Sequence, residues 1–307
     1  MKIFSNNLKS TFNRFVHKSF ASLRSHLGII ELSVITFKPK FTSTYVEFNL
    51  DNNTIRLKRD VSKQDILNLY KFSAKYGVKW GSDWKLDPEN NIIITPDGIK
   101  FLIDGFDTLI FAETFLYDIH FIDFDLTGRT VITAGAYVGD TPLYFAKKGA
   151  KVYAFEPQAS CFSIAKRNLE LNPDLSKNIV LENYAIGIDG SVEFPDTPCS
   201  GGASISMKNV NKSTVRSISI SNIVKEYGVE PDILDLDIKG EEFTVIKDKI
   251  LNRFNVVRIE YNRIEGLGDR NTIINKLKEY GFSKIRVYKH NELKLSLLDH
   301  GTILAVK

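Results

Sequence analysis

From Gly128 onward the chain alternates between short apolar runs and amphipathic runs, and this alternation restricts the fold more than any other feature. The apolar runs predict strands at 130–134, 151–155, 178–183, 232–236 and 255–260. The amphipathic runs predict helices at 141–148, 158–172, 241–251 and 270–280. Strands that alternate with helices form right-handed crossovers, so we expect an α/β domain with a mainly parallel, Rossmann-like sheet. After Gly281 two further runs predict a final antiparallel hairpin.

The chain before this domain has a different texture. Residues 44–59 predict a hairpin, because two runs of alternating character flank the turn-forming sequence Asp51-Asn52-Asn53. A helix is expected at 60–76, and two short strands are expected within 92–111. We therefore divide the chain into a basic segment at 1–50, a small α+β lead-in at 51–126 and a main domain at 127–307.

The positive charge of the chain is concentrated at its beginning. Residues 1–50 carry seven basic and two acidic side chains, whereas the whole chain has a net charge of +4, so the remaining residues sum to −1. That balance speaks against a nucleic-acid partner for the main domain. Residues 4–27 have apolar side chains at helical spacing between basic ones. Such a helix could dock on the body or on a second subunit, lie on a membrane surface, or be a cleaved targeting segment.

The two cysteines, Cys161 and Cys199, stand outside any CxxC or metal-binding spacing. We therefore expect no disulfide and a reducing, cytoplasmic location. The five histidines form no zinc motif, and no apolar run reaches the roughly 18 residues that a spanning helix needs.

The first chemical motif is the turn after the first predicted strand, ITAGAYVGD, which feeds a helix. Gly135 and Gly139 would let a ligand approach the backbone, with Asp140 or Thr141 as the helix cap. Tyr137 stands where a dinucleotide-binding GxGxxG turn requires a glycine. This departure argues against an NAD-linked oxidoreductase and is compatible with a nucleoside ligand that lacks a pyrophosphate.

Acidic side chains follow two further strands. Glu156, before Pro157, stands at the tip of the second strand, about 20 residues beyond the glycine turn, where a carboxylate can hold both hydroxyls of a ribose. Asp237 follows the fourth strand in the sequence LDLDIKGEE. A carboxylate at the tip of a central strand faces the ligand crevice of an open α/β sheet.

Together these motifs resemble the FkbM family of methyltransferases. The resemblance covers about residues 105–307 and includes the glycine turn, AFEP, NYAIG, GGAS and LDLDIKGEE, in the family's order. It implies a class I methyltransferase fold with a C-terminal antiparallel hairpin and S-adenosylmethionine as cofactor. It also implies O-methylation of a hydroxyl on a sugar, glycolipid or secondary metabolite, so the expected partner is a small-molecule or carbohydrate acceptor.

The resemblance assigns roles to individual residues. Gly135 and Gly139 match the cofactor turn, Glu156 with Pro157 matches the ribose acid, and Asp237 and Glu242 match the family's Asp and last Glu. The remaining assignments place Asn183, Ala185 and Ile186 around the adenine and Glu113 at the methionine end of the cofactor.

Several cofactor-turn and fourth-strand positions depart from the family pattern. Thr133 replaces an acid and Tyr137 an asparagine, while Asp235 and Lys239 replace a lysine and a glutamate. One hypothesis is that Asp235 and Lys239 pair, so that the ion pair was exchanged as a unit. The alternative is a methyltransferase fold with weak or no activity that serves as a binding scaffold.

For catalysis we expect Asp237 to take the acceptor proton, with Glu260 assisting. The two carboxylates could instead share a metal ion with Asn262. The Gly201-Gly202-Ala203-Ser204 loop is expected to close over the acceptor.

Overall fold

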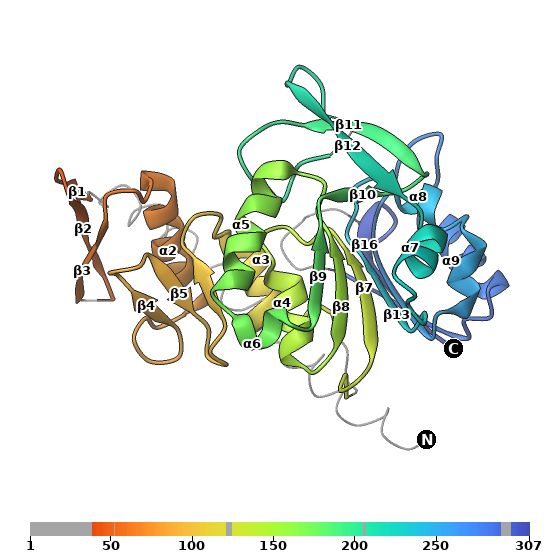
Figure 1. The fold of residues 1–307 in the computed structure, drawn as a ribbon, viewed down its shortest axis with the longest axis horizontal. Coiled ribbons are helices and arrows are strands. Elements are labelled where there is room, and N and C mark those ends of the chain that lie inside the picture. Colours follow the sequence, from red (N-terminus) through yellow and green to blue (C-terminus); the bar gives the residue numbers. More distant parts are fainter. Residues whose placement is uncertain (1–38, 52, 121–124, 205–206, 290–295) are drawn as a thin grey trace. The chain divides into compact units, whose positions relative to one another are not determined.

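The computed structural model describes residues 39–51, 53–120, 125–204, 207–289 and 296–307. The chain forms two compact units, Met1–Phe124 and Asp125–Lys307 (Figure 1). The amphipathic segment at 4–27 lies outside the described residues. No helix in the described ranges is long and apolar enough to cross a bilayer.

The described residues of the first unit form two small antiparallel sheets and three helical segments. Its elements are β1 (Lys40–Phe41), β2 (Tyr45–Leu50), β3 (Asn53–Lys58), α2 (Lys63–Tyr76), β4 (Lys85–Asp87), β5 (Ile92–Ile94), β6 (Lys100–Leu102), α3 (Thr108–Phe111) and the π-helix η1 (Ala112–Leu116). The expected hairpin is present as β2 and β3, which pair antiparallel. A capping box at Ser62 begins α2, and Gly77 ends it in the left-handed conformation. Phe72 on this helix packs against Trp84 and Phe106 and so anchors an aromatic core.

The second unit contains a seven-stranded sheet in the order β15-β16-β14-β13-β7-β8-β9. Its strands are β7 (Thr130–Ala134), β8 (Lys151–Phe155), β9 (Ile179–Glu182), β13 (Ile233–Leu236), β14 (Val256–Asn262), β15 (Lys284–Tyr288) and β16 (His300–Val306). The first five are parallel, and β16 runs antiparallel to both of its neighbours. The predicted class I methyltransferase sheet with its terminal hairpin is confirmed.

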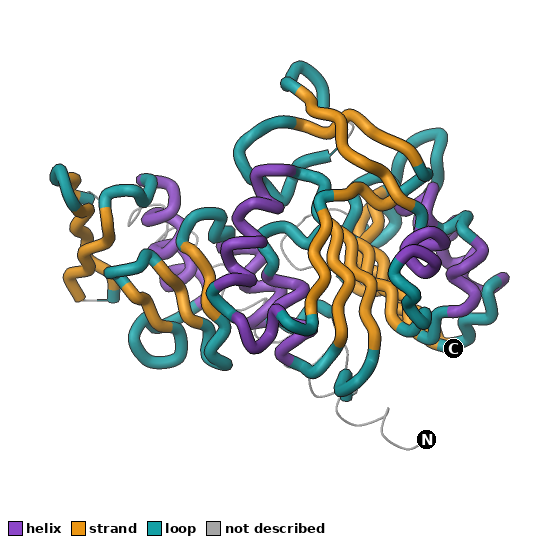
Figure 2. The backbone as a smooth tube through the Cα atoms, in the orientation of Figure 1, coloured by secondary structure: helices purple, strands orange, loops and turns teal. Residues whose placement is uncertain are grey.

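Helices cover both faces of this sheet (Figure 2). The helices α4 (Asp140–Lys147), α5 (Ala159–Glu170) and α6 (Pro173–Ser176) lie on one face. The other face carries α7 (Ile220–Glu226), α8 (Glu242–Val245), the 3-10 helix η2 (Lys249–Arg253) and α9 (Arg270–Glu279). The expected single helix at 241–251 is wrong. Asp248 has an extended backbone and its side chain accepts from the Ile250 amide, which ends one helix and begins the next.

A second, three-stranded sheet was not foreseen from the sequence. It has the order β10-β12-β11, formed by β10 (Tyr184–Ile186), β11 (Gly190–Pro195) and β12 (Lys212–Ile218). The loop between β11 and β12 contains the Gly201-Gly202 pair. This sheet therefore gives that loop two fixed ends, since β11 and β12 pair along six residues.

The glycine turn between β7 and α4 is shaped by protein packing. Gly135 has a φ of 85°, and a Cβ there would stand 2.3 Å from the carbonyl oxygen of Asp237. At Gly139, with a φ of 88°, a Cβ would meet Leu169 at 3.2 Å. Gly139 is also the residue before the first turn of α4, so neither Asp140 nor Thr141 caps the helix as expected. The bare backbone thus lets β7 and β13 end side by side and lets α4 approach α5.

Replacement of Gly135 by Ala should test this close approach. Gly281 has a nearly identical φ of 88°, and a Cβ added there would meet nothing within 4 Å, so Gly281→Ala reports the backbone cost alone. We expect Gly281→Ala to lower the free energy of unfolding by about 1–2 kcal/mol and Gly135→Ala by about 1–3 kcal/mol more. Chemical denaturation measures the free energy of unfolding of both variants. Equal losses would show that the Asp237 carbonyl can move away from the added Cβ without cost.

Candidate functional site

The carboxyl ends of four adjacent parallel strands bring together most of the predicted site residues. The Gly135–Gly139 turn follows β7, Glu156 follows β8, Asp237 follows β13, and Glu260 lies near the end of β14. The strand order β14-β13-β7-β8 places these positions side by side along one edge of the sheet. Ligands of open α/β sheets bind at this edge.

Glu156 joins the first two strand ends. Its Oε2 accepts from the Tyr137 amide and its Oε1 from the Gln158 amide, both at 2.8 Å. Burial raises the pKa of this carboxyl to about 7, the two backbone hydrogen bonds oppose that rise, and nearby Asp237 and Asp140 add to it. A protonated oxygen would face an amide N–H at either position, so the geometry suits the ionised form.

Tyr137 adopts a left-handed backbone conformation, with a φ of 47°. This region is unfavourable for a tyrosine and better tolerated by asparagine, the residue of the family pattern. The bond from its amide to Glu156 holds the backbone in place. The replacement of asparagine by Tyr137 therefore changes the side chain, while the backbone of the turn still directs the amide N–H of this residue to Glu156.

The residues predicted to surround the adenine lie next to Glu156. The Asn183 side chain donates to the carbonyl oxygens of Glu156 at 2.8 Å and of Pro157 at 3.1 Å. Ala185 and Ile186 are buried in β10. Glu113 lies in the first unit, within η1, and its predicted contact with the cofactor stays a prediction.

Lys239 stands between the two carboxylates predicted to act in catalysis. Its Nζ is 3.3 Å from Asp237 Oδ1 and 3.5 Å from Glu260 Oε1. The side chains of Lys239, Asp237 and Glu260 are 34%, 42% and 11% exposed, so the group opens to solvent mainly on the Asp237 side. Attraction to Asp237, and then to Glu260, raises the pKa of the Lys239 ammonium despite its partial burial.

Asn262, the third residue of the alternative metal site, has a histidine as its hydrogen-bond partner. The Asn262 Oδ1 lies 2.9 Å from Nδ1 of His300, its cross-strand neighbour on β16. Within the described part of the chain, no group of three His, Cys, Asp or Glu side chains is arranged to hold a metal ion.

Asp235 pairs with a residue that the sequence analysis did not consider. Arg258 Nη1 donates to Asp235 Oδ1 at 2.7 Å, and Thr133 Oγ1 donates to Asp235 Oδ2 at 3.1 Å. Thr133, Asp235 and Arg258 are aligned across β7, β13 and β14, and all three are buried. The hypothesis that Asp235 pairs with Lys239 is wrong, because Asp235 pairs with Arg258 while Lys239 reaches Asp237 and Glu260.

Glu242 is a second buried carboxyl near this edge. Its Oε2 accepts from the Gly240 amide at 2.6 Å, whereas Oε1 is buried and has no hydrogen-bond partner among the described residues. Burial raises the pKa of Glu242 to about 7 against this backbone bond, and Asp237 adds to the rise.

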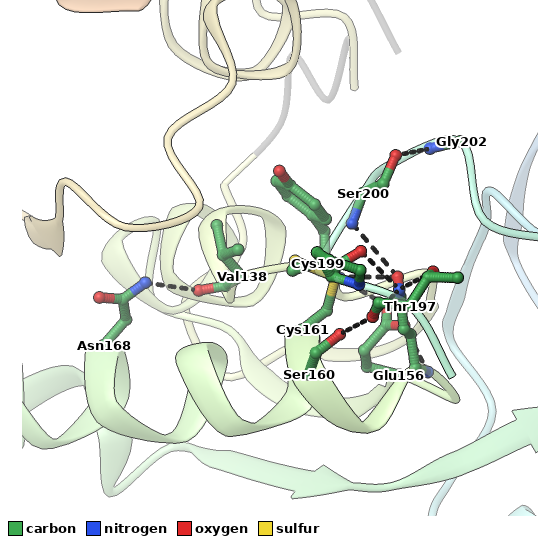
Figure 3. Close-up of a disulfide and its surroundings, with 12 residues drawn as sticks. Val138, Glu156, Ser160, Cys161, Asn168, Thr197, Cys199, Ser200 and Gly202 are labelled. Carbon is green, nitrogen blue, oxygen red and sulfur yellow. Dashed lines mark hydrogen bonds between the residues drawn. A yellow bond between two sulfur atoms is a disulfide. The ribbon is translucent and has the colours of Figure 1, made fainter. Parts of the chain in front are cut away.

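Cys161 and Cys199 form a disulfide, and the expectation of two free thiols is wrong. The loop that follows β11 folds back on α5, which joins cysteines separated by 38 positions (Figure 3). No short motif marks such a pair. The inference of a cytoplasmic location from free cysteines loses its basis, since disulfides persist mainly in oxidising compartments.

Hydrogen bonds fasten the same loop beside the disulfide. Gln158 Nε2 donates to the carbonyl oxygens of Thr197 and Pro198, both at 3.0 Å. Ser160 Oγ donates to the Thr197 carbonyl at 2.9 Å (Figure 3). Further along, Ser204 Oγ donates to the Lys239 carbonyl at 3.2 Å. The loop therefore spans from the residues after Glu156 to the residues after Asp237.

Comparison with known proteins relates the second unit to methyltransferases. The methyltransferase FkbM domain model matches residues 134–284. Residues 134–284 are an FkbM methyltransferase domain. Methyltransferase sdnD of Sordaria araneosa is 26% identical over an alignment of 194 residues that covers 51% of this chain and 74% of that protein. The family implies methyltransferase activity and an S-adenosylmethionine-type cofactor.

Solved structures of other methyltransferases are also similar. The N-terminal domain of human METTL16 in complex with SAH has 15% identity and a TM-score of 0.40, covering 94% of each chain. Precorrin-6y C5,15-methyltransferase from Geobacter metallireducens has 12% identity and a TM-score of 0.37, covering 59% of this chain and 82% of that one.

Two functional features of the FkbM domain were missed from the sequence. Arg258 interrupts the apolar run VVRIEY, and a charged residue inside a buried strand could have signalled a buried partner. Gln158 follows the AFEP motif directly, but its role depends on a loop about 40 positions away, for which the sequence carries no local signal.

The disulfide should stabilise the domain by closing a long loop. For a separation of 38 positions, we expect Cys161→Ala/Cys199→Ala to lower the free energy of unfolding by about 3–4 kcal/mol. Protease cleavage within 197–204 should also become faster. Reductant should reproduce both effects in the wild type and change nothing in the double variant, and a wild type insensitive to reductant would contradict the bridge.

The buried Glu242 should make stability depend on pH. Its folded-state pKa of about 7 lies above the ordinary value of 4.5, so the folded protein binds more protons and the free energy of unfolding falls as the pH rises between these values. We expect Glu242→Gln to match the wild type near pH 4.5 and to exceed it by up to about 3 kcal/mol at pH 8. Urea denaturation measures the free energy of unfolding of both proteins. The same difference between variant and wild type at both pH values would refute the shift in pKa.

Proposed function

We propose that the protein is an S-adenosylmethionine-dependent O-methyltransferase that acts on a hydroxyl of a small-molecule or carbohydrate acceptor. The observation that carries the proposal is the buried Glu156 carboxylate at the edge of an FkbM methyltransferase domain. The acceptor class follows from the family resemblance and from the carboxylates at the same edge.

The residues around Glu156 fit the cofactor. A carboxylate offers about four acceptor positions, and backbone amides take one on each oxygen of Glu156, which leaves acceptor capacity for two ribose hydroxyls. Asn183 fixes the Glu156–Pro157 backbone, and we assign the nearby apolar residue Ala185 to the adenine.

Asp237 is the residue that we assign to proton transfer. When bound, S-adenosylmethionine supplies a methyl group on a positively charged sulfonium, which is already reactive toward an oxygen nucleophile. Asp237 is half-exposed and therefore accessible to an acceptor hydroxyl, whose proton it can accept. Glu260 is more buried and stabilises the same cluster through Lys239. The fixed strand ends would align the acceptor hydroxyl with the methyl group of the cofactor. Alignment of two reactants supplies much of the rate acceleration in a methyl transfer.

The loop between β11 and β12 is our candidate for the acceptor wall. It runs from the Gln158 contacts to the Lys239 contact, so it spans the strand ends assigned to cofactor and acceptor. Gly201 and Gly202 lie between these attachments and allow close approach of a ligand.

Cofactor binding tests the proposal directly. Isothermal titration of the wild type with S-adenosylmethionine should give micromolar affinity, and Glu156→Gln should weaken it about 10- to 100-fold because a charged acceptor is lost. Since the pKa of Glu156 is about 7, wild-type affinity should also fall as the pH decreases from 8 to 6.

A matched control and a contrary result are available. Glu170→Gln, on the exposed end of α5, should bind as the wild type does. No binding by a folded wild type would reject the proposed function. Binding that Glu156→Gln leaves unchanged would place the cofactor elsewhere.

A further inference from the structure

The position of the Lys239 ammonium distinguishes this site from a simple pair of catalytic carboxylates. Nζ lies 3.3 Å from Asp237 Oδ1 and 3.5 Å from Glu260 Oε1, so one cation serves carboxylates that come from two adjacent strands. Hard divalent cations also bind between carboxylate oxygens that converge from separate elements. The ammonium therefore fills the place that such an ion would take.

The backbone around Lys239 is fixed on both sides. Gly240 has a φ of 106°, and its amide donates to Glu242. The Lys239 carbonyl accepts from Ser204 Oγ in the loop between β11 and β12. The lysine stem thus starts from an anchored turn, and its ammonium is directed into the cluster rather than into solvent.

We propose that Lys239 is the built-in cation of the acceptor site and replaces a divalent metal ion between Asp237 and Glu260. The two carboxylates and the ammonium carry a net charge of −1. One negative charge thus remains to accept the proton of the acceptor, while the ammonium holds both carboxylates in place. The inference deepens the proposed function and rests on it for the meaning of the acceptor site.

The family pattern has the opposite charge at the position of Lys239. The family pattern has a glutamate at the position of Lys239, which would add a third acid where this chain has a cation. The sequence exchange therefore changes the formal charge of the cluster by two. A metal ion would fit the acidic version, and the lysine of this chain occupies that space.

Manganese binding tests the replacement without requiring an acceptor. Electron paramagnetic resonance with Mn²⁺ alone should show binding to wild type that is weaker than millimolar. Lys239→Met keeps the apolar stem and removes the charge, and it should bind Mn²⁺ at least tenfold more tightly. Lys239→Glu should bind more tightly still, and Lys239→Met/Asp237→Asn should return to the wild-type level.

The controls separate this proposal from the others. Lys225→Met, in the last turn of α7, should behave as the wild type. Circular dichroism establishes that each variant is folded, and Lys239→Gln provides a second neutral side chain should Lys239→Met not fold. Equal Mn²⁺ affinity in the wild type and the neutral variants would overturn the proposal. Failure of the wild type to bind S-adenosylmethionine would instead reject the proposed function, because it concerns Glu156.

Discussion

The buried ion pair between Asp235 and Arg258 is the interaction on which the arrangement of the site depends. The two side chains are buried on one face of the sheet, where Thr133 donates a further hydrogen bond to Asp235, so the contacts link three neighbouring strands. Loss of one partner from such a pair leaves an uncompensated buried charge, which costs about 3–5 kcal/mol. The pair therefore disfavours any shift of register between β7, β13 and β14. That register brings Asp237 and Glu260 to the same edge.

The same pair explains why the charge exchanges in the sequence do not disturb the sheet. A family lysine at position 235 and a family acid at position 133 would be cross-strand neighbours in the observed register. Here Thr133 replaces the acid, Asp235 reverses the charge, and Arg258 on the next strand supplies the cation. The ion pair of this chain therefore joins β13 to β14, whereas the family residues would join β13 to β7. Since Arg258 neutralises Asp235, Lys239 remains available to Asp237 and Glu260.

The sequence predicted the framework of the second unit better than its tertiary contacts. Strand positions, the terminal hairpin and the edge that carries Glu156 and Asp237 follow from local periodicity and from the direction of parallel strands. The partners of Asp235 and Lys239 depend on register and on side-chain direction, which residue spacing alone does not determine. The disulfide and the sheet of β10, β11 and β12 depend on contacts between distant segments. The glycine turn was located correctly, but the reason for Gly135 is the carbonyl of Asp237, a residue about 100 positions away.

The loop between β11 and β12 connects the two halves of the edge physically. The disulfide and Gln158 attach its first part to α5 beside Glu156, while Ser204 attaches its later part to the turn that carries Lys239. A displacement of this loop would act on the backbone next to the proposed ribose acid and on the backbone next to the proposed cation. The glycine pair lies between these fixed points, so local movement can occur there without release of either end. The proposed cofactor and acceptor positions are thus both attached to one covalently restrained segment, and the covalent restraint is closest to Glu156.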